Sequence, residues 1–148
     1  MIRFTVYGVP QPKGSTKAFV PKGWTRAIVT STTKGLKGWE QQIAAAANAV
    51  ASGVLLEGPL NVTIDFRLPR PTSLPKRVRQ HTRRPDLDKI VRGACDALTQ
   101  VIWKDDSQIV VLSVTKKYCI GAETPCALFQ IVPLRQDGSP EVQERQVG

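Results

Sequence analysis

The chain has 148 residues, 41% of them hydrophobic, and its 21 Lys and Arg against 12 Asp and Glu give a formal net charge of +9. This length suits one domain with a hydrophobic core, and the apolar content excludes a wholly disordered chain. No apolar run is long enough to span a bilayer, so a membrane is not an expected partner. The N-terminal segment lacks the apolar stretch of a signal peptide, and we therefore expect a cytoplasmic protein.

The cysteine content argues against a zinc site, and the charge indicates which class of molecule the protein binds. Cys95, Cys119, Cys126 and the single histidine, His81, do not have the close spacing of zinc ligands, so we expect reduced thiols in the core. The excess of cations favours a polyanionic partner, most often nucleic acid, over a surface that is merely basic. The few aromatic residues form no clustered stacking set, which argues against an RNA-binding module.

The first half of the chain is predicted to form a strand, a hairpin and a helix. Residues 2–9 alternate as a strand that ends at the turn sequence PQPKG. The segment KAFVPKGWTRAIVT is typical of a hairpin with residues 21–23 as its turn. Apolar residues then recur at helical spacing until Gly53, a natural helix stop. This stripe consists of Leu36, Trp39, Ile43, Ala47 and Val50.

The second half is predicted to form three strands and one helix. Residues 60–68 alternate between apolar and polar side chains without a break, which predicts a half-buried strand. After a proline-rich loop, a second helix is predicted to begin near Asp88. The sequences IVVLSVTKKY and CALFQIVPL are rich in β-branched or apolar residues and predict two further strands. The second helical stripe consists of Ile90, Val91, Ala94, Ala97, Leu98 and Val101.

The order of these elements predicts the fold class. Strands and helices mix without a regular alternation, which favours an α+β fold over a doubly wound one. We expect a single compact domain over residues 1–134, with a mixed β-sheet and two main helices packed on it. The tail over residues 135–148 is polar and aperiodic, and we expect it to be frayed or disordered.

The loop before the second helix is strongly basic. It has no acid between Asp65 and Asp86, yet it holds seven of the chain's 21 Lys and Arg. Cations on a proline-stiffened loop can neutralise several phosphates, and counterion release would supply affinity without sequence preference. The alternative is a passive, solvated charge run. The predicted DNA contacts are Arg67, Arg70, Lys76, Arg77, Arg79, Arg83 and Arg84, extended by Lys13 and Lys17 of the first loop.

Two aspartates follow this loop directly. Because Pro85 disfavours helix at Arg84, the chain is expected to enter Asp86 extended, so that Asp86 and Asp88 face the same side. Two carboxylates on one side suit a hard cation such as Mg²⁺, which prefers oxygen ligands. The alternative is that Asp88 is only the N-cap of the helix, and the two roles do not exclude each other.

A second acidic pair, Asp105 and Asp106, stands just before the next strand. A helix of about thirteen residues is roughly 20 Å long, so this pair meets the first only if the strand folds back along the helix. The alternative is an ordinary polar turn. Asp96, four residues after Arg92, is predicted to form a structural ion pair with it. Arg92 and Lys89 either steady a phosphate or its transition-state charge, or are solvated helix cations.

The sequence RRPDLDKIVRGACDALT, followed by VIWKDDSQIV, resembles the RusA-type Holliday junction resolvases, small dimeric endonucleases of bacteria and their phages. The similarity is close from Arg84 to Val111 and looser over PQPKG, the tryptophan-bearing first helix and the strand over residues 60–68. It implies a homodimer that cuts four-way junction DNA symmetrically, in recombination and repair, inside a bacterial or phage-infected cell. It also implies Mg²⁺ as the cofactor, with Mn²⁺ as a substitute.

The resemblance also implies roles for individual residues. It maps the metal-binding carboxylates onto Asp86, Asp88 and one of the later pair, Asp106 ahead of Asp105. The chain has Lys89 where the family often has Asn, and Arg92 where the family usually carries a catalytically important lysine. Arginine keeps the positive charge but does not readily give up a proton, so charge stabilisation is the role that Arg92 retains.

Two other functions compete with this one. A nuclease of the restriction-endonuclease kind places a lysine two residues beyond its second acid, and neither Lys89 nor Lys104 has that spacing. A DNA-binding protein without catalysis, whose aspartates only cap and pair, is the alternative of another class. On the resolvase hypothesis, the cations bring the DNA in and the carboxylates hold the metal ion that cuts it.

Overall fold

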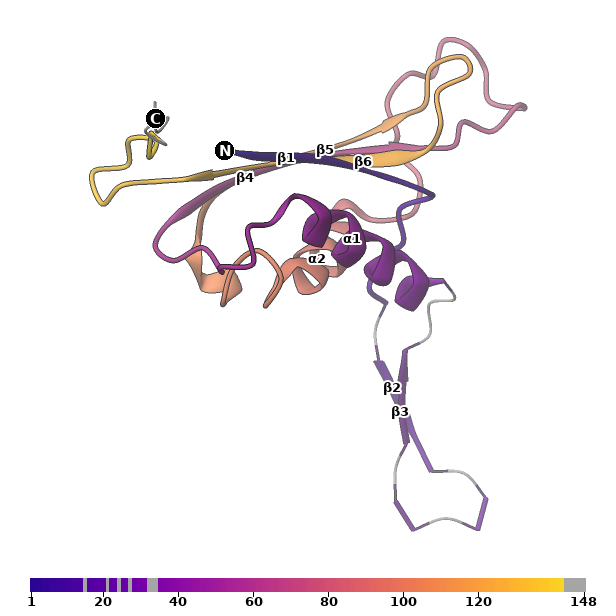
Figure 1. Cartoon of the computed structure of the whole chain (residues 1–148). Coiled ribbons are helices and arrows are strands. Elements are labelled where there is room, and N and C mark those ends of the chain that lie inside the picture. Colours follow the sequence, from indigo (N-terminus) through magenta and orange to yellow (C-terminus); the bar gives the residue numbers. More distant parts are fainter. Residues whose placement is uncertain (15, 21, 24, 27, 32–34, 143–148) are drawn as a thin grey trace.

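The protein is described by a computed structural model, which covers residues 1–142 except 15, 21, 24, 27 and 32–34. A four-stranded mixed sheet in the order β1-β6-β4-β5 forms its centre. Two helices cover one face of this sheet, and a separate two-stranded hairpin projects from the helix side (Figure 1). The elements are β1 (Ile2–Tyr7), β2 (Thr16–Phe19), β3 (Ile28–Ser31), α1 (Leu36–Val50), β4 (Leu60–Leu68), α2 (Leu87–Leu98), the 3-10 helix η1 (Asp106–Gln108), β5 (Ile109–Tyr118) and β6 (Cys126–Pro133). This confirms the predicted α+β domain with two main helices.

Strand β4 is the centre of the core. It pairs parallel with β5 and antiparallel with β6, so its backbone is bonded on both sides. Its alternation places every second side chain under the helices, as predicted. The buried residues of β4, none more than 3% exposed, are Leu60, Val62, Ile64, Phe66 and Leu68.

The helix stripes pack on this face largely as predicted. Trp39, Ile43 and Ala47 of α1 are buried in the same core cluster as the buried β4 residues. The prediction that Val50 belongs to the packed stripe is wrong, because this residue is 45% exposed. The packed face advances by four residues, from Ala47 to Ala51, so Val50 turns outward.

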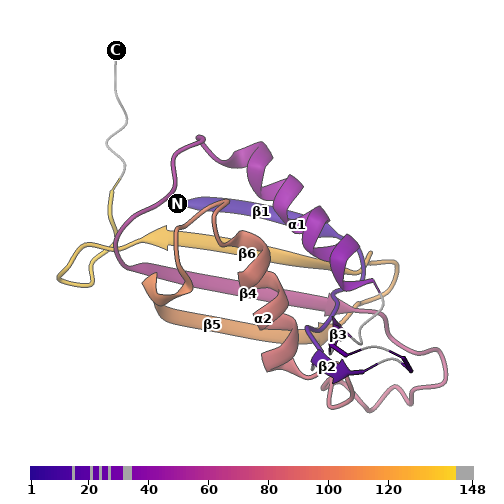
Figure 2. The same ribbon diagram turned by 90° about the horizontal axis from the view of Figure 1, so that it is seen from below.

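Strands β4 and β5 are joined by α2 in a parallel β-α-β unit (Figure 2). Parallel neighbours need such a crossover, because the chain must return to the start of the sheet before the second strand begins. Helix α2 therefore begins near the C-terminal ends of β4 and β5 and ends near the start of β5. With 12 residues, it spans about 18 Å.

The predicted hairpin and the tail are only partly described. Strands β2 and β3 pair antiparallel, which confirms the hairpin, but Pro21 of its predicted turn lies outside the described residues. In the tail, the Arg135 amide donates to the Ser139 carbonyl at 2.8 Å, and the Glu141 amide donates to the Pro133 carbonyl at 2.8 Å. These bonds order the tail as a turn up to Glu141. Within the described part of the chain, every helix is too short or too polar to cross a bilayer.

The three cysteines are buried and free, as predicted. Burial raises the pKa of the Cys95 thiol to about 12 and also raises the pKa values of Cys119 and Cys126. Because the thiolate is the reactive form, we expect the folded protein to resist Ellman's reagent at pH 8 and to release three equivalents after unfolding in guanidinium. Rapid labelling of the folded protein would contradict this arrangement.

Candidate functional site

The first turn of α2 carries two exposed carboxylates. Asp86 is the N-cap residue with extended backbone, whereas Asp88 already lies inside the helix. The predictions that Asp88 is extended, or that it is the cap, are therefore wrong, because the helix begins at Leu87, whose side chain packs against the core. The Asp86 carboxylate lies 3.5 Å from the Lys89 ammonium, and both side chains are about half exposed. Negative charge at this end also interacts favourably with the helix dipole.

Arg92 lies one turn after Asp88 on the same side of the helix, and it is exposed. The predicted Arg92–Asp96 ion pair is wrong, because Asp96 pairs with Lys13 of the PQPKG loop instead. Among the described residues, no carboxylate lies within ion-pair distance of the Arg92 guanidinium. Arg92 is therefore available to an external anion, whereas Lys13, a predicted DNA contact, is engaged within the fold.

A glycine in α2 explains how the PQPKG loop reaches this helix. A Cβ at Gly93 would lie 3.3 Å from Cδ1 of Leu36, a tight contact that a small shift of the leucine side chain would relieve, and 3.5 Å from the Gln11 carbonyl oxygen, so glycine lets the loop approach the helix closely. The Lys13 amide then donates to the Lys89 carbonyl at 3.0 Å. The loop is thus fastened along α2, beside the turn that bears the carboxylates.

Asp106 lies at the other end of α2. Its Oδ1 accepts hydrogen bonds from Thr99 Oγ1 at 2.6 Å and from Trp103 Nε1 at 2.9 Å. The chain does fold back into β5, but Asp106 stands before that strand and stays beside the helix C-terminus. The expected convergence of Asp106 with Asp86 and Asp88 is therefore wrong for the single chain, because the length of α2 separates them.

Asp105 has a local structural role. It caps η1 by accepting a hydrogen bond from the Ser107 amide at 2.8 Å, while the Gln108 side chain bonds back to the Asp105 amide. The hydrogen bonds from Ser107 hold the pKa of the Asp105 carboxyl below its ordinary value. The polar-turn alternative therefore describes Asp105 well.

The positions of the acidic side chains decide whether they can bind a metal ion together. The described residues contain no group of three His, Cys, Asp or Glu side chains that could hold a metal ion. The described part of this single chain therefore does not assemble a three-carboxylate site. The donor pair of Asp86 and Asp88 still fits the chemistry of Mg²⁺, which proteins often bind through one or two carboxylates together with substrate phosphates.

Besides Lys13, two more of the predicted DNA contacts, Arg67 and Arg70, are used inside the fold. Arg67 donates to Asp65 at 2.7 Å and to Glu123 at 3.0 Å, and all three side chains are largely covered. Although burial alone would raise the pKa of Asp65, hydrogen bonds from Arg67 and Thr115 hold it below its ordinary value. Because its guanidinium is saturated by carboxylates, Arg67 is a poor partner for phosphate.

Arg70 shapes the basic loop from within. Its guanidinium donates to the Val78 carbonyl at 2.7 Å and to the Pro75 carbonyl at 2.8 Å, and it lies 5.4 Å from the Tyr118 ring centroid. The same ring stacks on buried His81, with 4.3 Å between centroids. Arg70 therefore determines the shape of the loop rather than presenting charge outward.

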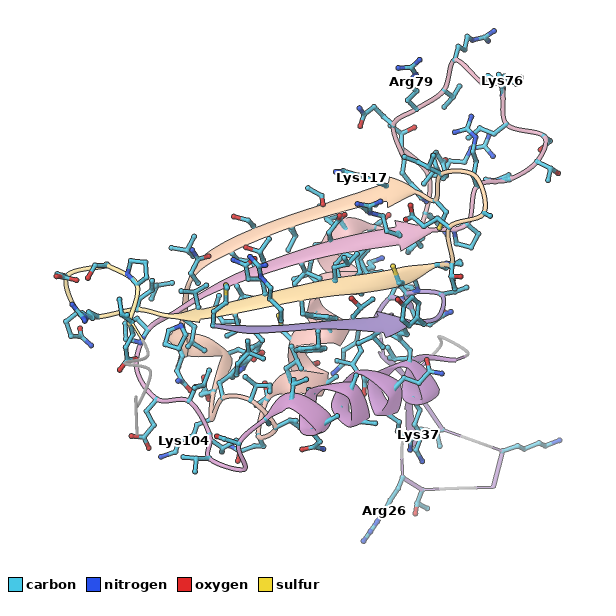
Figure 3. All side chains as sticks on the ribbon, turned by 45° about the horizontal axis from the view of Figure 1, so that its top comes forward. Arg26, Lys37, Lys76, Arg79, Lys104 and Lys117 are labelled. Carbon is cyan, nitrogen blue, oxygen red and sulfur yellow. The ribbon has the colours of Figure 1, made fainter. Side chains whose placement is uncertain are left out.

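The remaining cations of the loop face solvent. Figure 3 shows Lys76 and Arg79 on the outer part of the loop, beyond the ends of β4 and β5 and directed away from the sheet. The side chain of Lys17 lies outside the described residues. The exposed cations, named here as the outer basic loop, are Lys76, Arg77, Arg79, Arg83 and Arg84.

Sequence reasoning missed Lys116 of β5. Its Nζ donates to the Arg83 carbonyl at 2.7 Å and to the Pro85 carbonyl at 2.8 Å. These bonds fasten the end of the basic loop to the sheet, immediately before Asp86. Lys116 pairs in register with Phe66, so it stands on the core-facing side of β5, on the same face as the end of the basic loop that it holds.

We expect Lys116→Met to destabilise the protein by about 1–3 kcal/mol, since the Arg83 and Pro85 carbonyls would both lose a charged hydrogen-bond donor. Urea unfolding checks this. Lys117→Met removes the same charge from the neighbouring position on the other face, and it should change the free energy of unfolding by no more than about 0.5 kcal/mol. Equal effects of the two variants would show that the Lys116 contacts do not hold the loop.

The fold and its surface define a basic α+β domain in which a cationic loop leads into a helix that begins with exposed carboxylates. The family model described as endodeoxyribonuclease RusA matches residues 8–124. The chain therefore belongs to the RusA endodeoxyribonuclease family. It is also similar to the uncharacterized protein YqaN of Bacillus subtilis (strain 168), with 32% identity over 127 residues that cover 79% of this chain and 87% of that protein.

Proposed function

We propose that the protein is an endodeoxyribonuclease that resolves four-way (Holliday) DNA junctions by paired symmetric cuts. The observation that carries this proposal is the family match, which includes the outer basic loop and both acidic pairs. On this proposal, the loop holds the DNA backbone without reading its sequence, because phosphate contacts position DNA and carry no base information.

The acidic turn of α2 is the proposed place of the chemistry. Asp86 and Asp88 would hold Mg²⁺, or Mn²⁺ in its place, and a bound ion would polarise the phosphoryl oxygen and activate a water. Arg92 would offset the negative charge that develops on the phosphate, because its planar guanidinium matches the geometry of phosphate oxygens. Lys89 would contribute less than Arg92, because it is turned towards Asp86.

A homodimer in the bacterial cytoplasm completes the proposal. A four-way junction has two-fold symmetry, and its resolution needs two cuts in opposed strands. A C2 dimer presents two identical sites related by the same symmetry.

The test is cleavage of a synthetic four-way junction by the purified protein in MgCl₂. We expect two nicks at symmetric positions, products that a ligase can seal, and no cutting of a linear duplex with the same sequence. EDTA should stop cleavage. Junction that is bound but remains intact in Mg²⁺ and in Mn²⁺ would favour the alternative, a DNA-binding protein without catalysis.

A further inference from the structure

The single histidine of the chain, His81, lies at the base of the basic loop, between two places where this loop is fastened to β5. Just before it, Gln80 forms an antiparallel bridge with Lys117. Just after it, the Lys116 ammonium holds the Arg83 carbonyl at 2.7 Å. The histidine itself is buried, with 8% exposure. Its state therefore bears on the shape of the loop and on the start of the acidic turn that follows.

The His81 imidazole is accommodated mainly by stacking. Its ring centroid lies 4.3 Å from that of Tyr118 in β5, and the Arg70 guanidinium lies 5.4 Å from the centroid of the same tyrosine ring. Within the described part of the chain, neither His81 Nδ1 nor the Tyr118 hydroxyl has a hydrogen-bond partner, although both atoms are buried. Buried polar atoms are nearly always hydrogen-bonded, so two exceptions on stacked rings call for an explanation.

The surroundings of the ring disfavour a positive charge. Burial, and then the Lys116 ammonium, lower the pKa of His81 below its ordinary value of 6.5, and the charge of Arg83 acts in the same direction. The backbone carbonyls of His81 and Arg83 oppose this in part. A protonated ring would thus be a buried charge beside two cations. It would also compete with Lys116 for the Arg83 carbonyl, because imidazolium and ammonium are both donors.

We propose that His81 is a proton-sensitive positioning residue, which keeps the base of the outer basic loop in its DNA-binding shape only while the imidazole is uncharged. A proton on the ring repels Lys116 and draws the Arg83 carbonyl away from it, so the fastening beside Asp86 opens. The folded chain takes up this proton less readily than the unfolded chain does. Loop order is therefore complete above about pH 6.5 and is lost as the pH falls below that value. The inference rests on the proposed DNA contact of the loop and adds a residue that regulates it.

Proton NMR measures the titration directly, because the imidazole signals of a chain with one histidine are unambiguous. We expect a midpoint below 6.5, with signals of the neutral ring shifted upfield by the stacked Tyr118. Lys116→Met should raise the midpoint, since it removes a cation that acts on the ring. The matched control, Lys117→Met, removes the same charge from the other face of β5 and should leave the midpoint nearly unchanged. A parental midpoint at or above 6.5 would overturn the proposal.

Junction binding at pH 7.5 and at pH 5.5 tests the consequence for DNA, with Ca²⁺ in place of Mg²⁺ so that binding is measured apart from cleavage. We expect the parent's affinity to fall at least about threefold at the lower pH. His81→Phe keeps a ring to stack on Tyr118 but cannot take up a proton, so its affinity should be the same at both pH values. Histidine is the one side chain whose ordinary pKa lies in this interval. Equal pH dependence of the parent and His81→Phe would contradict the proposal.

These outcomes separate the two proposals. Binding with the expected pH dependence by a parent that does not cut in Mg²⁺ would support the role of His81 and overturn the proposed nuclease function. Cleavage by the parent at pH 7.5, with junction binding that is unchanged at pH 5.5, would support the nuclease and overturn the role of His81.

Discussion

Asp88→Asn is expected to abolish cleavage of four-way junction DNA while leaving junction binding intact. The substitution keeps the size of the side chain and removes its charge at an exposed position in the first turn of α2. A carboxylate that holds the catalytic metal ion supports transition-state stabilisation of several kcal/mol, which corresponds to roughly 10²-fold or more in rate. Gel-shift titration in Ca²⁺ and single-turnover cleavage in Mg²⁺ measure the two properties separately.

The matched control for this variant is Asp137→Asn, which makes the same chemical change in the exposed C-terminal turn. It should cut at the parental rate. Retention of more than about a tenth of the parental rate by Asp88→Asn would remove Asp88 from the chemistry. A parallel loss of binding would instead mean that Asp88 has a structural role.

Neutralising three cations of the outer basic loop is expected to weaken junction binding by about a hundredfold or more at 0.1 M salt. The triple variant Lys76→Ala, Arg77→Ala and Arg79→Ala removes three exposed charges that contact no carboxylate within the described chain. If each charge meets one phosphate, the slope of log K against log salt should become less steep by about 2.7. Binding isotherms between 50 and 200 mM salt measure both quantities.

The control for this loop variant carries Arg3→Ala, Lys37→Ala and Arg135→Ala, which lower the net charge equally on other exposed surfaces. Its affinity should fall much less, and its salt slope should stay close to that of the parent. Equal losses for the two triple variants would mean that the overall charge attracts DNA and that the loop is not a specific contact surface.

Local patterns in the sequence predicted the elements of the fold well. The unbroken alternation of β4 and the helical stripe around Trp39 and Ile43 both lie on the core side, as predicted. These signals depend on the spacing of neighbouring residues, which the geometry of one helix or strand converts directly into a buried face. The family was also recognisable from the sequence, because its closest similarity lies in the continuous stretch from Arg84 to Val111, and the family model matches residues 8–124.

Whether each charged side chain is paired within the fold or free could not be predicted from local patterns. Lys13 is 83 residues from its partner Asp96, and Arg67 is 56 residues from Glu123. From the sequence, Lys13 and Arg67 were predicted to be free for DNA. The composition does not indicate which distant carboxylate the fold will place next to each cation. Lys116 was missed for a related reason, because its partners are backbone carbonyls that any sequence possesses.

By itself, the sequence determined the α+β class, the bounds of most elements, the buried thiols and the family, because all of these depend on local order along the chain. Only the tertiary structure decided where the acids lie. The parallel crossover from β4 through α2 to β5 puts Asp88 and Asp106 at opposite ends of a rigid helix, and no pattern of neighbouring residues encodes that separation. The same crossover leaves β5 at the edge of the four-stranded sheet, a position that likewise depends on the order in which the strands pair.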